Sequence, residues 1–135
     1  MKKFYLNTLL YIYGLIDSGR KTYDTRAPDF KDENKRFDLA SPGDIAIVIP
    51  VDEQFRRIDR PELMFSIGEV YYFSPGEYNG DWRKIIKKMF KDIPVEKIFP
   101  RFTIEEALSE YERFSSTDRI GRNGIVAMEL AERLE

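Results

Sequence analysis

The sequence predicts a mixed α/β (α+β) domain organised around a small β-sheet. Two apolar runs of strand length, residues 45–51 and 62–73, are bounded by turn residues and rich in β-branched or aromatic side chains. Because each run is nearly continuous, both faces of each strand should be covered, as in neighbouring central strands. Segments with helical spacing supply that cover. The 135 residues suit one domain, which we expect to span residues 1–135.

The first half of the chain should begin with a strand at residues 3–8 that pairs in the same sheet. Residues 8–16 fit either a helical stripe or a strand, and we favour a short helix or an irregular segment that ends near Ser18 and Gly19. The basic, polar segment 20–28 is expected to be a loop, whereas residues 31–40 should be partly helical. A Pro-Gly-Asp turn at residues 42–44 then leads into the first apolar run.

The second half carries clear helix signals. Asp81 can cap a helix over residues 82–93, in which apolar side chains recur at helical spacing until Pro94 ends it. A further strand is expected at residues 95–99. Thr103 and Glu106 have the spacing of a capping box, which should open a helix reaching about residue 113.

The end of the chain is expected to be a polar connection at residues 115–124 followed by a short helix at residues 125–134. A helical pattern that still continues at Glu135 is also what a domain cut from a longer multidomain protein would show.

The composition excludes several classes of site. The chain has no cysteine and no histidine, so disulfide scaffolds, cysteine nucleophiles, Cys-rich zinc sites and imidazole bases are all absent. No Walker or Rossmann glycine motif is present, and we expect no cofactor and no metal. The apolar runs are too short to span a bilayer and the N-terminus is a poor secretion signal, so we expect a cytoplasmic protein with no membrane partner.

Aromatic side chains in predicted loops are the first candidates for binding. Aromatic residues make up 14% of the chain, more than a small core readily hides. Rings beside a sheet can stack on nucleic-acid bases, or can simply cover the edge of the core. The rings in question are Tyr23, Phe55, Tyr78 and Trp82.

Cations are the second candidates, because the net charge of −2 leaves only local patches for phosphate contacts. One face of the predicted helix 82–93 is basic, and a second cluster lies in the loop before residue 62. Such faces bind phosphates or are simply solvated. The candidate phosphate-binding residues are Arg56, Arg57, Arg83, Lys84, Lys87 and Lys88, with Arg60 and Lys91 beside them.

Carboxylates offer the remaining route to chemistry. Glu69 lies in a predicted strand and can face water, and the pair Glu105 and Glu106 is explained by the capping box. Paired carboxylates catalyse reactions when they share a cleft and their pKa values differ. We therefore predict no catalytic residue and not an enzyme, with any catalysis placed in another domain or subunit.

The order of these segments resembles the PUA-like superfamily, in particular its EVE and YTH branch. The resemblance covers most of the chain as a pattern, and it is carried by Lys3-Phe4-Tyr5-Leu6, Tyr23-Asp24-Thr25, Pro42-Gly43-Asp44 and Ser66-Ile67-Gly68-Glu69-Val70. The resemblance implies a PUA-like (EVE/YTH) curved β-barrel of about five or six strands with flanking helices.

The same resemblance implies that a modified, methylated base is flipped out of its strand into an aromatic cage. The first wall of such a cage is a tryptophan whose place is taken here by Tyr23, and the other walls follow the strand that contains Gly68. The base-binding residues implied are Tyr23, Asp24, Thr25, Tyr78 and Trp82.

Prokaryotic relatives of this kind are targeting modules of McrBC-type, modification-dependent DNA restriction systems, in which a fused or associated NTPase and a nuclease cut the DNA. The resemblance therefore implies modified DNA, favoured over RNA, as the partner. An RNA-binding module of the same fold is the first alternative. A protein-interaction or small-ligand domain is the second, and the net acidity of the chain favours it.

Overall fold

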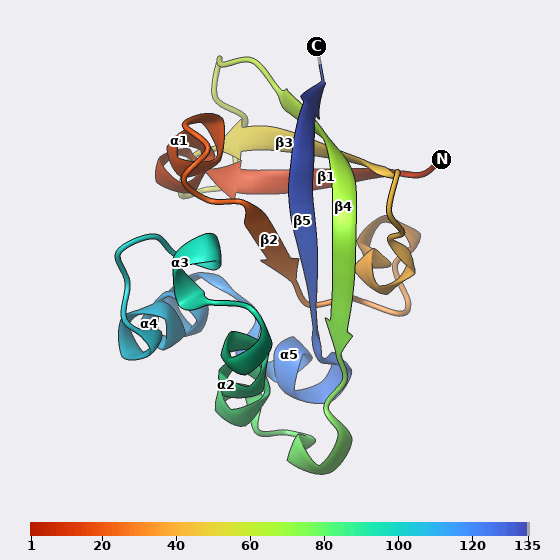
Figure 1. The fold of residues 1–135 in the computed structure, drawn as a ribbon, viewed down its shortest axis with the longest axis vertical. Coiled ribbons are helices and arrows are strands. Elements are labelled where there is room, and N and C mark those ends of the chain that lie inside the picture. The colour runs from red at the N-terminus through yellow and green to blue at the C-terminus, as the bar shows by residue number, and fades with distance from the viewer. Residues whose placement is uncertain (135) are drawn as a thin grey trace.

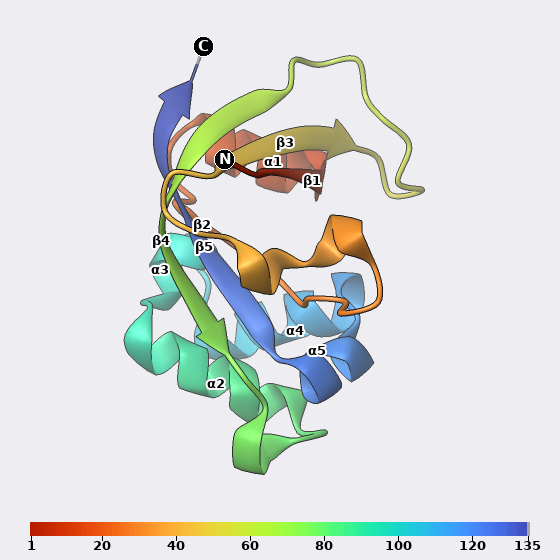
Figure 2. The same ribbon diagram turned by 90° about the vertical axis from the view of Figure 1, so that its right-hand side faces the viewer.

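The structure, a computed structural model that describes residues 1–134, contains a five-stranded sheet with the order β1-β3-β4-β5-β2. The sheet curls into a half-barrel, with the helices of residues 82–123 gathered at the end of the molecule opposite the C-terminus and the helix of residues 10–17 beside β1 and β3 (Figures 1 and 2). The mixed α+β class is therefore confirmed. The strands are β1 (Lys3–Leu9), β2 (Tyr23–Arg26), β3 (Ile45–Val51), β4 (Leu63–Phe73) and β5 (Ile125–Leu134).

The two apolar runs are neighbouring internal strands, as the sequence predicts. β3 pairs with β4 antiparallel, from Ile45 opposite Ser66 to Val48 opposite Leu63. β1 pairs with the other side of β3 in parallel along its whole length. β4 continues along β5 with register shifts between Ser66 and Val70, and such irregularities bend a strand, as the curl of this sheet requires. β1 and β2 are left as the two edges of the half-barrel.

Hydrophobic clusters cover both faces of the sheet. One cluster fills the inside of the curl and joins strand residues such as Leu6, Val48 and Met128 to α1 (Leu10–Asp17). The other lies between the sheet and the later helices and contains Phe73, Ile125 and Ala127. Those helices are α2 (Trp82–Asp92), α3 (Val95–Ile98), α4 (Ile104–Phe114) and α5 (Thr117–Asn123).

The helix signals in the sequence correspond to real helices. α1 confirms the helical choice for residues 8–16, and α2 begins where the Asp81 carboxylate accepts a hydrogen bond from the Lys84 amide. Both hydrogen bonds of the capping box between Thr103 and Glu106 are present at the start of α4. Residues 31–40 form two short 3-10 turns, η1 (Glu33–Lys35) and η2 (Phe37–Leu39), so the expectation of a partly helical segment is confirmed.

Two predictions for the C-terminal third were wrong. Residues 125–134 form strand β5, not a helix, and the buried side chains of Ile125, Val126, Ala127 and Met128 follow one another without a gap. A short continuous apolar run is compatible with the spacing of either a helix or a strand. Pairing with β4 on one side and β2 on the other makes it a strand. Residues 115–124, expected to be a connection, contain α5, which the Ser116 hydroxyl caps by accepting from the Arg119 amide.

Two further segments differ from expectation. Residues 95–99 were predicted as a strand but form the single turn α3, in which the buried Ile98 anchors the helix to the core. Residues 20–28 were predicted as a loop but include edge strand β2, paired with β5 from Tyr23 opposite Glu129 to Arg26 opposite Val126. Polar edge strands are hard to recognise, because one side of the strand has no neighbour to reward apolar residues.

Gly124 makes the passage from α5 into β5 possible. Its φ is 83°, and a Cβ at this position would lie 2.3 Å from the Phe73 carbonyl oxygen. Both the backbone conformation and the close approach of β4 therefore require glycine.

None of the helices in the described part of the chain is long and apolar enough to cross a membrane.

Candidate functional site

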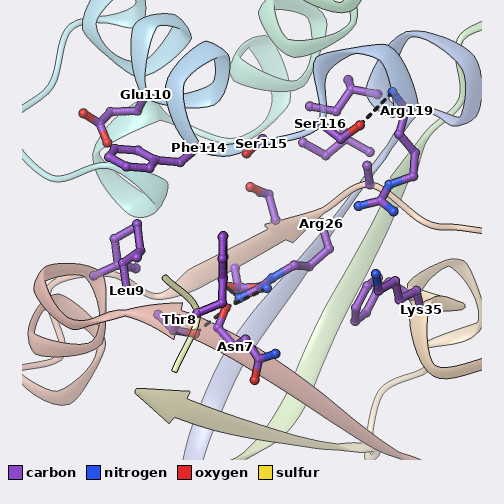
Figure 3. Close-up of a pocket in the computed structure, with 18 of the residues that line it drawn as sticks. Asn7, Thr8, Leu9, Arg26, Lys35, Glu110, Phe114, Ser115, Ser116 and Arg119 are labelled. Atoms are coloured by element: carbon purple, nitrogen blue, oxygen red, sulfur yellow. Dashed lines mark hydrogen bonds and ion pairs between the residues drawn. The ribbon is translucent and has the colours of Figure 1, made fainter. Parts of the chain in front are cut away.

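A cleft of about 650 Å³ lies where the half-barrel is open, between its edges β1 and β2. We call it the edge cleft. This volume falls within the roughly 300–1,000 Å³ range of small-molecule sites. Its walls come from β1, from η1, from the chain between α4 and α5, and from the segment 21–27, which contains β2 (Figure 3). It therefore collects side chains from distant parts of the sequence.

Three charged side chains from residues 21–26 line the cleft. Asp24 and Lys21 are buried, with 3% and 4% of their surface exposed. The Arg26 Nε donates to the Asp24 Oδ2 at 2.8 Å, and its Nη1 and Nη2 donate to the Asn7 carbonyl at 3.0 Å and the Thr8 Oγ1 at 3.3 Å. Arg26 thus reaches from β2 to β1 and joins the two edges of the sheet.

Lys21 is the most perturbed cation of the cleft. Its Nζ donates to the Ile98 carbonyl at 2.7 Å and lies 5.0 Å from the centre of the Phe99 ring. Burial lowers the pKa of Lys21 to about 8, while the carboxylate of Asp24 raises it and the guanidinium of Arg26 lowers it further. Near neutral pH, Lys21 is therefore a cation that gives up its proton more easily than an exposed lysine.

Thr25, on the other face of β2, is held by α4. Its Oγ1 and the Tyr111 hydroxyl lie 2.6 Å apart, and either oxygen can be the donor. Burial raises the pKa of Tyr111, so its phenol stays protonated. This contact fixes β2 against the helices and keeps the cleft residues next to Thr25 in place.

The lining of the cleft also includes exposed aromatic rings. Phe55 has 66% of its surface exposed, although it lies among the residues that line the cleft. Its φ is 61°, a left-handed conformation that is strained for a non-glycine residue. The turn is held by Asp52, whose carbonyl accepts from the Phe55 amide and whose carboxylate accepts from the Gln54 and Arg56 amides. Tyr5 of β1 is exposed on the same lining.

Two of the five predicted base-binding residues, Asp24 and Thr25, line the cleft. Tyr23 does not, because its buried ring belongs to the cluster under the helices, 6.4 Å from the Tyr71 ring. Tyr78 and Trp82 are partly buried against that same cluster. The three rings predicted to form a cage thus share one hydrophobic cluster, and none of them lines the edge cleft.

The predicted phosphate-binding residues lie outside the cleft, and most of them are paired. Arg56 contacts Asp52 at 3.0 Å and Arg57 contacts Glu62 at 3.1 Å. On α2, Arg83 pairs with Glu112 at 2.9 Å, Lys84 with Asp81 at 3.9 Å and Lys87 with Glu105 at 3.9 Å, and the exposed Lys88 forms no ion pair among residues 1–134. The acidic partners from α4 reduce the positive potential of this face.

Sequence reasoning missed four cations that line the cleft, namely Lys21, Arg26, Lys35 and Arg119. One signal was available: Asp24 and Arg26 are two residues apart, which puts opposite charges on one face of a strand. That signal required the segment to be recognised as a strand. Nothing local marks Lys35 and Arg119, since they belong to η1 and α5 and meet only in the folded chain.

Comparison with known proteins identifies structures with a similar fold but gives no information on function. No protein-family model matches the chain, and no curated protein matches it by sequence. The chain is similar to the crystal structure of the hypothetical protein PH0355, with a TM-score of 0.68 and 23% identity, covering 98% of this chain and 99% of that one. It is also similar to the solution structure of protein PF0455 from Pyrococcus furiosus, with a TM-score of 0.60 and 21% identity, covering 98% of both chains. These likenesses establish a shared fold.

Proposed function

We propose that the protein is a nucleic-acid-binding module that takes one flipped base into the edge cleft. The observation that carries this proposal is the charged group of Lys21, Asp24 and Arg26, of which Lys21 and Asp24 are buried, in a cleft with room for a nucleoside. A planar base edge offers several hydrogen-bond donors and acceptors, and buried polar groups in fixed positions can match them. The curled sheet with helices against it is compatible with a PUA-like domain of the EVE and YTH type.

Phe55 is the apolar side chain that would stack on the base. An exposed phenylalanine in a strained turn needs a reason, and stacking on a base is one. Stacking contributes roughly 1–3 kcal/mol per base, and flipping a base costs a few kcal/mol. Phe55 would offset part of the flipping cost, and hydrogen bonds to Asp24 and its neighbours the rest. The base therefore enters the edge cleft in place of a cage built from Tyr23, Tyr78 and Trp82.

The proposal in its most specific form is that the base is methylated and that the module directs a restriction system to modified DNA. A methyl group adds apolar contact worth under about 1 kcal/mol unless the pocket is shaped around it. Discrimination would thus depend on how closely the cleft fits the modified base. RNA binding by the same cleft is the nearest alternative.

Fluorescence anisotropy with labelled single-stranded DNA, methylated DNA and RNA of one sequence tests the proposal. Phe55→Ala should weaken binding by about tenfold, the equivalent of one stacked base. Tyr78→Ala is the matched control, because that ring packs outside the cleft and its loss should leave affinity unchanged. Equal affinity of the wild type and Phe55→Ala, or a loss confined to Tyr78→Ala, would place the base elsewhere. Tighter binding of RNA would replace DNA as the partner.

The lowered pKa of Lys21 favours catalysis as a second candidate. A lysine with a pKa of about 8 is partly neutral in the cell and can accept a proton from, or attack, a bound ligand. Base-modified nucleosides that bind can be incubated with the protein and analysed by mass spectrometry. Turnover that Lys21→Met abolishes while binding persists would favour an enzyme, and recovery of unchanged ligand would favour a binding module.

A further inference from the structure

One part of the cleft wall holds two cations that the contacts described so far do not use. Arg119 reaches into the cleft from α5, and Lys35 lies across from it on η1 (Figure 3). They lie far apart in the sequence and line the same cleft only because η1 and α5 both border it. Two cations that line one cleft attract an anion into it.

The guanidinium of Arg119 is short of partners. Its Nε is buried and has no hydrogen-bond partner among residues 1–134. Its Nη1 forms an ion pair with the Asp29 Oδ2 at 3.8 Å, which is longer than a hydrogen bond and leaves other donors of the guanidinium unused. Only 27% of the side chain is exposed, so water replaces few of the missing contacts. Buried donors are nearly always satisfied in folded proteins, so this exception needs an explanation, and a bound anion is one.

Lys21 and Arg26 already have partners within the protein, so little of their charge is left for a phosphate. Arg26 is bound to Asp24 and to β1, and the Lys21 ammonium is bound to the Ile98 carbonyl. Lys35 is exposed and forms no ion pair within the described residues. An incoming anion would therefore find its strongest attraction at Arg119 and Lys35.

We propose that Arg119 and Lys35 form a phosphate subsite, so that the cleft takes a phosphorylated nucleoside unit rather than a bare nucleoside. This inference rests on the proposed function and names the part of the ligand that lies next to the base. A planar guanidinium offers two parallel donors that match phosphate oxygens, and a flexible lysine adds a second charge. The phosphate comes from either a free nucleotide or the backbone of a strand.

Calorimetric titration of the whole chain tests the subsite with three ligands: a nucleoside, its 5′-monophosphate and a trinucleotide containing the same base. The wild type should bind the monophosphate about tenfold more tightly than the nucleoside, and Arg119→Gln should reduce this ratio to near one. Tighter binding of the trinucleotide than of the monophosphate would identify a strand as the source of the phosphate, and the reverse order would identify a free nucleotide.

Arg122→Gln is the matched control on α5, because the Arg122 Nε donates to the Asp118 carbonyl on its own helix. The nucleotide preference should be unchanged in this variant. Lys35→Gln alters an exposed side chain, so it should fold and reduce the preference by a few-fold. It keeps the test decisive if Arg119→Gln does not fold. A preference for the monophosphate that persists in both Arg119→Gln and Lys35→Gln, or no preference in the wild type, would overturn the subsite.

A thermal-shift titration with inorganic phosphate separates this inference from the proposed function. Stabilisation of the wild type by phosphate that Arg119→Gln loses would support the subsite even if no base-containing ligand bound, and the proposed function would then fail alone. Nucleoside binding with no effect of phosphate would leave the proposed function standing and remove the subsite.

Discussion

The edge cleft and the basic face of α2 both gather cations, but they do so under different conditions. The α2 face carries more positive side chains, yet Arg83, Lys84 and Lys87 are exposed and paired with carboxylates. The cleft carries fewer, but Lys21 is buried and Arg26 is bound to the buried carboxylate of Asp24. Screening by water and salt weakens exposed ion pairs, whereas the attraction between charges is stronger in the low dielectric of a buried site. The comparison shows that the surroundings of a charge, and not the number of charges, distinguish a site.

The largest difference between the two regions should appear in the pH dependence of stability. The pKa of Lys21 is about 8 in the folded chain and 10.5 ordinarily, so between these values the unfolded chain binds more protons. Stability should therefore rise with pH over this window, by up to about 3 kcal/mol for Lys21 alone. Urea unfolding should show that the free energy of unfolding of the wild type rises with pH across this window relative to that of Lys21→Met.

Lys88→Met is the control for that measurement, since Lys88 is an exposed lysine on α2. Its unfolding free energy should follow the wild type at every pH. A difference between wild type and Lys21→Met that stays constant with pH would mean that folding does not lower the pKa of Lys21.

A smaller difference is expected from removing one arginine in each region. Arg26→Met leaves the buried Asp24 carboxylate without its partner and should lower the free energy of unfolding by about 2 kcal/mol, a value reduced because Arg26 is partly exposed. Arg83→Met breaks an exposed pair with Glu112 and should cost less than about 1 kcal/mol. Chemical denaturation of both variants at neutral pH measures the two values. Equal losses would abolish the distinction between the regions.

The smallest effect concerns salt. If the cleft neutralises about two phosphates through Arg119 and Lys35, the logarithm of the affinity for a single strand should fall with the logarithm of salt concentration with a slope of about −1.4. Replacing Lys87 and Lys88 together by glutamine should leave that slope unchanged. A steeper slope that flattens in this double variant would show that the α2 face contacts the phosphates after all.

Local signals were enough to predict a large part of the fold. β3 and β4 are apolar runs between turn residues, and α2 and α4 carry caps whose hydrogen bonds all lie within four residues of the helix start. β5 was predicted as a helix, because residues 125–128 are buried on both faces of the strand and their apolar run also fits helical spacing. β2 was missed, because its polar side chains face the cleft.

The candidate site was predicted only in part, for a related reason. Asp24 and Thr25 were identified, whereas the partners that give the cleft its character come from far along the chain. Lys21 is bound by a carbonyl 77 residues away, and Thr25 by a tyrosine 86 residues away. Tyr23 was expected in a cage because of the family resemblance, whereas in the structure its ring packs in the cluster under the helices.

The sequence by itself determined the mixed class, the two central strands, the capped helices and the absence of thiol and imidazole chemistry, because each depends on residue type and short-range spacing. Only the tertiary structure decided which charges are buried, which are paired and which face an open cleft. Those properties depend on the curl that brings β1, β2, η1 and α5 around one space, and no short stretch of the chain encodes that meeting.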